Sequence, residues 1–271
     1  MTAYIGPWGN LVEFQCPSAV EISMGSRSSF MTTLGGRVVE QRGPSPRRSW
    51  QVGIGVAKPH EIAGLEALLA GAYGAPPWAW ISPDAAAQNM LMPAASRLDI
   101  GTYSSAGMPS GSRTAVDGVR LARTISCVEG DWVFFGTRAN GQGTPVRAGD
   151  VVTGSVYAEG SGLMRMVFFD EVGGWTGSLS KQLGEGLERH ALSASVPTGS
   201  VEVAVRVDAT EGIVVAGAPA ITLTNAPVPW AVGKGCAKAT VDGLDTTVLR
   251  AVRGSDAQNI SRYAFTIREL G

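Results

Sequence analysis

Short runs in which apolar and polar residues alternate are frequent along this chain, and they predict a protein built mainly of β-strands. In residues 47–56, Trp50, Val52, Ile54 and Val56 are separated by small or polar residues. This period of two is typical of a half-buried strand. Similar runs, bounded by Gly and Pro, predict earlier strands at residues 10–14, 28–33 and 36–41, with Gly35 and Gly36 forming a hairpin turn.

One segment has a helical period instead. Pro59 suits a first helical turn, and Gly71 or Gly74 is expected to end the helix. Its apolar stripe, expected to lie across a sheet, consists of Ile62, Leu65, Leu68 and Leu69. Residues 78–81, bounded by prolines, predict an edge strand, and residues 89–92 predict another strand.

The middle of the chain has a different character, with many valines and no helical pattern. After a Gly-, Ser- and Thr-rich stretch at 98–118, the alternation predicts strands at 119–127, 132–137, 150–158, 163–170, 188–194, 201–209 and 213–223. Residues 164–169 are apolar on both faces, which indicates a central strand. Seven or more strands without a helix predict a sandwich or jelly roll.

The length of 271 residues favours two domains. The last segment, 227–271, is too short to bury a core alone. It ends in an alternating run at 260–269 that predicts a closing strand. We therefore expect one domain formed by 1–95 and 227–271, with 96–226 inserted as a second domain.

Composition and charge exclude several classes. A hydrophobic content of 44%, a charged content of 17% and a net charge of -1 indicate a globular protein without the basic footprint of a nucleic-acid-binding protein. Cys16, Cys127 and Cys236 lie far apart and lack metal-ligand spacing, so each is expected to be a small buried residue. We expect no signal peptide, no membrane insertion and folding in the cytoplasm.

No arrangement of catalytic residues is evident. His60 and His190 are the only histidines and fall in different predicted domains, and no nucleophile elbow, dinucleotide fingerprint or phosphate loop occurs. The adjacent Asp170 and Glu171 would face opposite ways on a strand. We therefore predict that the protein is not an enzyme, although carboxylates from remote positions leave a hydrolase open.

Binding residues are easier to propose. Trp175 lies in a predicted glycine-rich loop, where it would stack on a sugar, fold back onto the sandwich or meet a neighbouring subunit. Tyr157 would line a concave face or belong to the core, and Trp132 is expected in the core. No cofactor is expected. A structural Ca²⁺ stays open as an alternative, and its oxygen donors would be Asp131, Asp150, Asp208 and Glu211.

The segment from Arg48-Ser49-Trp50 through Pro76-Pro77-Trp78-Ala79-Trp80-Ile81-Ser82-Pro83-Asp84 to Asn89-Met90-Leu91-Met92-Pro93 resembles minor tail proteins of siphophages that infect actinobacteria. Residues 1–95 with 227–271 resemble the tail-tube and distal-tail fold, a β-sandwich or barrel flanked by one helix. The resemblance implies a virion protein of the tail tip, assembled in the host cytoplasm as a ring of identical subunits between the tail tube and the adsorption apparatus. Candidate interface residues are Pro76, Pro77, Trp78, Trp80 and Trp230.

The inserted segment resembles carbohydrate-binding and galactose-binding jelly rolls, through residues 150–158, 195–201 and 216–223. This implies that an outward-facing jelly roll contacts host cell-wall glycan or a neighbouring tail protein, with Trp175 and Tyr157 as candidate glycan contacts. The alternative is a soluble glycan-binding module or accessory domain of a glycoside hydrolase. Neither reading implies sequence-specific nucleic-acid binding.

Overall fold

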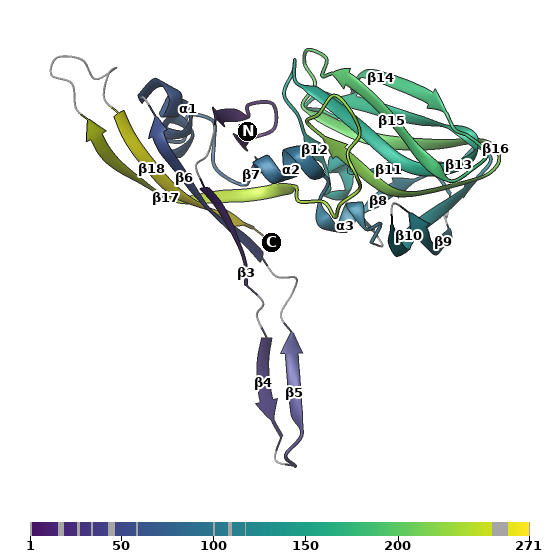
Figure 1. Cartoon of the computed structure of the whole chain (residues 1–271), viewed down its shortest axis with the longest axis horizontal. Helices are drawn as coiled ribbons and strands as arrows, with labels where there is room; N and C mark the ends of the chain where they lie inside the picture. The colour runs from purple at the N-terminus through teal and green to yellow at the C-terminus, as the bar shows by residue number, and fades with distance from the viewer. Residues whose placement is uncertain are drawn as a thin grey trace. The chain divides into compact units, whose positions relative to one another are not determined.

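The computed structural model of the chain is all-β, as expected (Figure 1). It describes residues 2–15, 19–25, 28–33, 35–42, 47–57, 59–99, 101–107, 110–116, 118–250 and 260–270. The chain forms two compact units. The first unit consists of residues 14–77 and 238–271, and the second consists of residues 2–13 and 78–237.

The first unit contains an antiparallel sheet in the order β17–β18–β6–β3. The strands are β3 (Ala19–Gly25), β6 (Arg47–Ala57), β17 (Cys236–Arg250, from Lys238 onward) and β18 (Ile260–Glu269). Ile267 pairs with Trp50 and Phe265 with Val52, and all four side chains are buried. The predicted closing strand is therefore confirmed, and so is the predicted alternation for Trp50, Val52 and Ile54. Val56 departs from it: the pairing with β18 shifts register after Ile54, so Val56 is 67% exposed and Ala57 is buried instead.

Helix α1 (Pro59–Leu69) belongs to the same unit. Its side chains Ile62, Leu65 and Leu68 are buried, as the helical spacing predicts, and Leu69 of the predicted stripe is half-buried. The helix ends where Gly71 adopts φ +84° and donates its N–H to the Leu68 carbonyl at 3.0 Å. Glycine reaches this left-handed conformation without a Cβ clash, which explains the stop.

Strands β4 (Ser28–Thr32) and β5 (Val38–Arg42) form a hairpin. They pair with each other and, within the described residues, with no other strand. The predicted turn is confirmed: Gly36 has φ +76° and its N–H donates to the Thr33 carbonyl at 2.8 Å.

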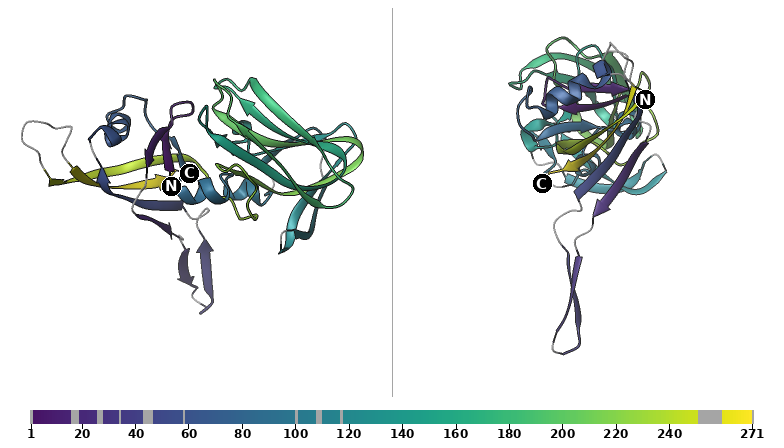
Figure 2. Two further views of the ribbon diagram at one scale, coloured as in Figure 1. Left: turned by 45° about the horizontal axis from the view of Figure 1, so that its top comes forward. Right: turned by 90° about the vertical axis from the view of Figure 1, so that its left-hand side faces the viewer.

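The second unit is dominated by one nine-stranded sheet that curls around a common interior (Figure 2). Its strands are β8 (Tyr103–Ser105), β9 (Ser110–Val116), β10 (Val119–Val128), β11 (Trp132–Phe135), β12 (Thr144–Pro145), β13 (Val151–Phe169), β14 (Trp175–Gln182), β15 (Glu188–Ser195) and β16 (Glu202–Thr222). The second unit also contains β1 (Thr2–Gly6), β7 (Trp78–Ile81) and the first two residues of β2 (Val12–Gln15).

The long strands β13 and β16 pair with each other, and the two halves of each strand belong to different layers of the curled sheet. The first half of β13 pairs with β15 and its second half with β14, while β16 pairs first with β11 and β12 and then with β10. The expected breaks at 158–163 and 209–213 are therefore wrong, because each pair of predicted strands is one bent strand. Glycine permits the bend: a Cβ at Gly162 would lie 2.3 Å from the Asp208 carbonyl oxygen.

The core of the second unit lies between these layers. Val203, Val205 and Val207 of β16 and Met164 and Met166 of β13 are fully buried in one cluster. The alternate residues of the same strands point to the opposite face of the sheet. These alternate residues form the outward face of the sheet.

Residues 78–95 differ from the prediction. β7 pairs with β1, has a strand on either side and is buried at all four positions, so it is not an edge strand. Residues 89–92 are not a strand, because Pro83 and Pro93 begin the short helices α2 (Pro83–Gln88) and α3 (Pro93–Ser96) on either side of them. The Ser82 hydroxyl caps α2 by accepting the Ala85 N–H at 3.1 Å.

The compact units are divided at 13/14, 77/78 and 237/238, whereas the predicted domains end at 95/96 and 226/227. Asn89 joins the segments around it to the second unit by bonding to the backbone of Ile221 and Ala231, and residues 2–6 join it because β1 pairs with β7. The division into a tail-type domain and an insert stays a prediction.

Cys127 and Cys236 are buried, as expected, and Cys16 lies outside the described residues. Burial raises the pKa of the Cys127 thiol to about 11. Within the described ranges, no helix is both long enough and apolar enough to cross a membrane.

Candidate functional site

The outward face of the second unit's sheet carries a cluster of aromatic and charged side chains. Phe134 on β11 lies opposite Arg206 on β16, which lies opposite Arg165 on β13, which lies opposite Ser180 on β14. Residues paired in this way project to the same face. We call this surface the aromatic face and define it by Trp132, Phe134, Arg165, Phe169, Trp175, Arg206 and Asp208.

Phe134 is the centre of the aromatic contacts. Its ring centroid lies 5.3 Å from that of Trp132, 5.9 Å from Phe169 and 6.3 Å from Trp175, and the Trp175 ring is nearly perpendicular to it at 88°. Edge-to-face geometry of this kind is favourable. Phe134 is 8% exposed whereas Trp175 is 52% exposed. The buried rings therefore support a tryptophan that remains half open to solvent.

Trp175 is the first residue of β14 and pairs with Phe169, so its predicted position within a loop is wrong. The turn before it is ordered by Asp170. One carboxylate oxygen, Oδ1, accepts the N–H of Val172 at 3.0 Å and that of Gly174 at 2.7 Å. This side-chain-to-backbone pattern stabilises the turn and fixes where the strand and its tryptophan begin.

Arg206 lies among three of the rings. Its Cζ is 5.1 Å from the Trp132 and Phe134 centroids and 5.6 Å from the Trp175 centroid, within the range of cation–π attraction. Asp208 accepts from Nε of Arg206 and from Nε of Arg165, each at 2.6 Å. A single carboxylate thus orients two guanidinium groups.

Glu202 begins β16 opposite Phe169 but is 3% exposed. It accepts the backbone N–H of Arg138, the first residue of the short 3-10 helix η1 (Arg138–Asn140), at 2.6 Å. Burial raises the pKa of this carboxyl above its usual range, although the Arg138 contacts oppose the shift. Glu202 therefore anchors η1 beneath the surface.

Tyr157 and Trp175, the two predicted glycan contacts, are not brought together. Tyr157 lies in the first half of β13, where it is partly buried against Val116, Ala122 and Ala218, and Arg189 Cζ lies 5.8 Å from its ring. Trp132, expected in the core, is half-buried at the margin of the small cluster around Phe134.

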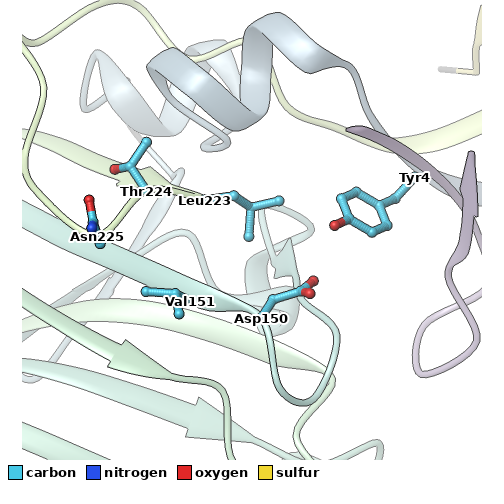
Figure 3. A pocket seen from close by; sticks show the side chains of 6 residues that line it. All are labelled: Tyr4, Asp150, Val151, Leu223, Thr224 and Asn225. Carbon is cyan, nitrogen blue, oxygen red and sulfur yellow. The ribbon is translucent and has the colours of Figure 1, made fainter. Parts of the chain in front are cut away.

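A shallow polar pocket of about 190 Å³ is lined by Tyr4, Asp150, Val151, Leu223, Thr224 and Asn225 (Figure 3). The Tyr4 hydroxyl points toward Asp150, and burial, followed by this carboxylate, raises the pKa of Tyr4 to about 12. Arg147 stacks on Tyr4 at 5.0 Å, donates to Asp150 at 3.0 Å and pairs with Glu13. The charged and polar groups beside this pocket are therefore already paired with one another.

Two of the predicted calcium donors, Asp150 and Asp208, are in ion pairs with arginines. Across the described stretches, no group of three or more His, Cys, Asp or Glu side chains is arranged to hold a metal.

The five predicted interface residues have different environments. Trp78 and Trp80 are buried, and Trp230 is half-buried with Nε1 donating to the Pro219 carbonyl at 3.1 Å. Pro76 and Pro77 are exposed. The two tryptophans of β7 thus lie inside the protein, because both faces of that strand are covered.

No protein-family model and no curated protein matches this sequence. Among solved structures, the enzymatically active domain of bacteriophage CBA120 tailspike protein 4 aligns over 49% of this chain and 21% of its own, with 14% identity and a TM-score of 0.38. The module TmCBM61 in complex with β-1,4-galactotriose aligns over 50% of this chain and 98% of its own, with 13% identity and a TM-score of 0.35. The CBM22-1 xylan-binding domain of Paenibacillus barcinonensis Xyn10C aligns over 46% and 87%, with 14% identity and a TM-score of 0.33. Likenesses at this level do not assign a ligand or an activity to this chain.

Proposed function

We propose that this protein binds carbohydrate, without catalysis, through the aromatic face of its second unit. The observation that carries the proposal is Trp175, a half-exposed ring supported by buried aromatic side chains. The C–H groups on one side of a sugar ring form an apolar surface that can cover such a ring, and the indole face attracts their partial positive charge. Covering Trp175 would remove its exposed apolar area from water.

The support beneath Trp175 favours binding because it is already in place. The Asp170 turn, the perpendicular contacts to Phe134 and Phe169 and the Arg206 guanidinium all limit motion of the indole. A ligand that meets a preorganised surface loses less free energy to ordering side chains. Arg206 adds N–H donors against the ring, and Arg165, bonded to the same Asp208, adds more on this face; N–H donors suit the hydroxyl oxygens of a sugar.

The test compares Trp175→Ala with Val172→Ala. Val172 is 91% exposed in the turn just before Trp175, and its truncation leaves the aromatic face intact. Isothermal titration against a panel of soluble plant and bacterial polysaccharides should identify a binder. We expect Trp175→Ala to weaken its binding by about tenfold or more, a loss of about 1.4 kcal/mol, and Val172→Ala to leave it unchanged. Absence of any binder, or binding that is indifferent to Trp175, contradicts the proposal.

A second function, assembly into a phage tail-tip ring that contacts tail-tube and tail-tip proteins, is favoured by a different feature. The β4–β5 hairpin exposes Met31 by 63%, Val38 by 62% and Val39 by 46%. Met31 and Val39 are paired and share one face, whereas Val38 lies on the other. A two-stranded hairpin is marginally stable alone, and exposed apolar residues on it mark a contact surface. A second copy of this chain is the partner that a ring requires.

Light scattering coupled to size exclusion tests this assembly. The wild type is expected to have a multiple of the chain mass, and the double variant Val38→Lys/Val39→Lys is expected to be monomeric. Val172→Lys, which places a charge on an exposed residue of the other unit, should leave the oligomer intact. A wild type that stays monomeric at every concentration argues against the ring.

A further inference from the structure

We propose that the carbohydrate bound by the aromatic face is acidic, and that Arg165 receives its anionic group. This inference rests on the glycan-binding function proposed above. It concerns which class of glycan is bound, so an experiment can contradict the acidic ligand without contradicting glycan binding.

The first observation is a cross-strand pair of like charges. Arg165 on β13 and Arg206 on β16 are directly opposite each other, and like charges in this position destabilise a sheet. Asp208 is the carboxylate that bonds to both. Two guanidinium groups and one carboxylate leave a formal charge of about +1 at this point of the face. An anionic ligand would complete the neutralisation.

The second observation concerns which hydrogen-bond donors remain. Arg206 directs both Nε and Nη2 to Asp208, and its guanidinium lies among the aromatic rings. Arg165 directs only Nε to Asp208, and its two terminal nitrogens have no protein partner among the described residues. The Arg165 side chain is 32% exposed, whereas Asp208 is 13% exposed. The two terminal nitrogens of the Arg165 guanidinium are therefore available to bind a carboxylate or phosphate in bidentate geometry.

The neighbouring acidic groups do not compete for these two nitrogens. Glu202, on the same side of β16, is buried and accepts from Arg138. Asp170 is bonded to the backbone of its own turn. Ser180, directly opposite Arg165 on β14, is exposed and adds a hydroxyl beside the guanidinium.

The Trp175 ring and the Arg165 guanidinium lie on the same face of the sheet. Trp175 pairs with Phe169, and Arg165 is four residues earlier on β13. At ~3.3 Å per residue the two backbone positions are ~13 Å apart along the strand. The long side chains shorten this separation, because Arg206, directly opposite Arg165, reaches to 5.6 Å from the Trp175 centroid and shares Asp208 with Arg165. A sugar stacked on Trp175 therefore has the acidic group for Arg165 on the same unit or on a neighbouring unit of one chain.

The experiment uses the full chain and compares acidic ligands with uncharged relatives of the same sugar backbone. Oligogalacturonates are compared with the same oligosaccharides as methyl esters, and a wall teichoic acid provides phosphate in a second arm. We expect at least one acidic ligand to bind about tenfold more tightly than its neutral counterpart, with an affinity that falls as salt rises. Arg165→Gln should remove this difference, and Arg165→Lys, which keeps the charge but loses the bidentate geometry, should retain part of it. Arg189→Gln, beside Tyr157, should retain all of it.

The outcomes separate the two proposals. Equal binding of the free and esterified forms, lost in Trp175→Ala, overturns the acidic ligand and leaves glycan binding in place. Preference for the acid that persists in Arg165→Gln overturns the role of Arg165. Failure of every glycan on the wider panel overturns both. Preference for phosphate over carboxylate, lost in Arg165→Gln, supports the anion site and identifies its ligand chemistry.

Discussion

Asn89 is expected to contribute more to the stability of the second unit than any other single polar side chain described above, and Asn89→Ala tests this. Its side chain is 0% exposed and makes four hydrogen bonds to backbone groups. Nδ2 donates to the carbonyls of Pro219 at 3.2 Å and Ala231 at 2.9 Å. Oδ1 accepts the N–H groups of Leu91 at 3.1 Å and Ile221 at 3.2 Å.

The expected loss follows from these four bonds. A typical intramolecular hydrogen bond contributes a net ~1 kcal/mol, and a buried group left without a partner loses more. Asn89→Ala should therefore lower the free energy of unfolding of the second unit by about 4 kcal/mol. That is a large part of the ~5–15 kcal/mol that stabilises a typical protein. The exposed Asn225 provides a matched control, because Asn225→Ala removes the same amide where it makes no such bonds.

Urea unfolding followed by circular dichroism measures the loss, and native-state hydrogen exchange with mass spectrometry assigns it to segments. Because a chain of two units need not unfold in one step, the segment-resolved measurement is decisive. Amides of residues 83–92 and 219–223 should exchange faster in Asn89→Ala and be unchanged in Asn225→Ala. A loss below about 1 kcal/mol, with unchanged exchange in both segments, would refute the reasoning.

Three further predictions concern the pH dependence of stability, the reactivity of the Cys127 thiol and the glycine at the bend of β13. Burial raises the pKa of the Glu202 carboxyl in the folded state, so stability should fall as pH rises from the unfolded pKa of this group through its folded pKa. Glu202→Gln should flatten this decline in Tm between pH ~4 and neutrality. A wild-type Tm that rises across this window contradicts the prediction. Cys127, buried and with a pKa of about 11, should resist iodoacetamide in the folded protein at mildly alkaline pH and react in urea, as peptide mass spectrometry would show; rapid labelling without denaturant contradicts its burial. Gly162→Ala places a Cβ 2.3 Å from a backbone oxygen and should lower the free energy of unfolding by about 2 kcal/mol or more. Gly186→Ala, with open space around it, should change that free energy by less than about 0.5 kcal/mol. Equal effects of the two variants in thermal unfolding would argue against a steric need for glycine at the bend of β13.

Part of the candidate site is visible in the sequence. Trp175 is singled out because an aromatic residue among glycines is costly to expose. The run 201–209 shows its polar face, which includes Arg206 and Asp208. The contact of these residues with Arg165 depends on the register between β13 and β16, and no local pattern specifies that register. The role of Asn89 is not predicted for the same reason, since three of its four partners lie more than 100 residues away in the sequence.

The sequence by itself determines the elements whose signal is local. The alternation of Trp50, Val52 and Ile54 in β6, the alternation in β18, the helical spacing of α1 and the glycine turn of the β4–β5 hairpin each arise from side chains within a few residues of one another, and these are confirmed. Tertiary structure alone decides that β13 and β16 are single bent strands, that the tryptophans of β7 are buried, and that two arginines face each other beside Trp175. These features depend on which strands lie side by side, and that choice is made by burial summed over the whole unit rather than by any short stretch of chain.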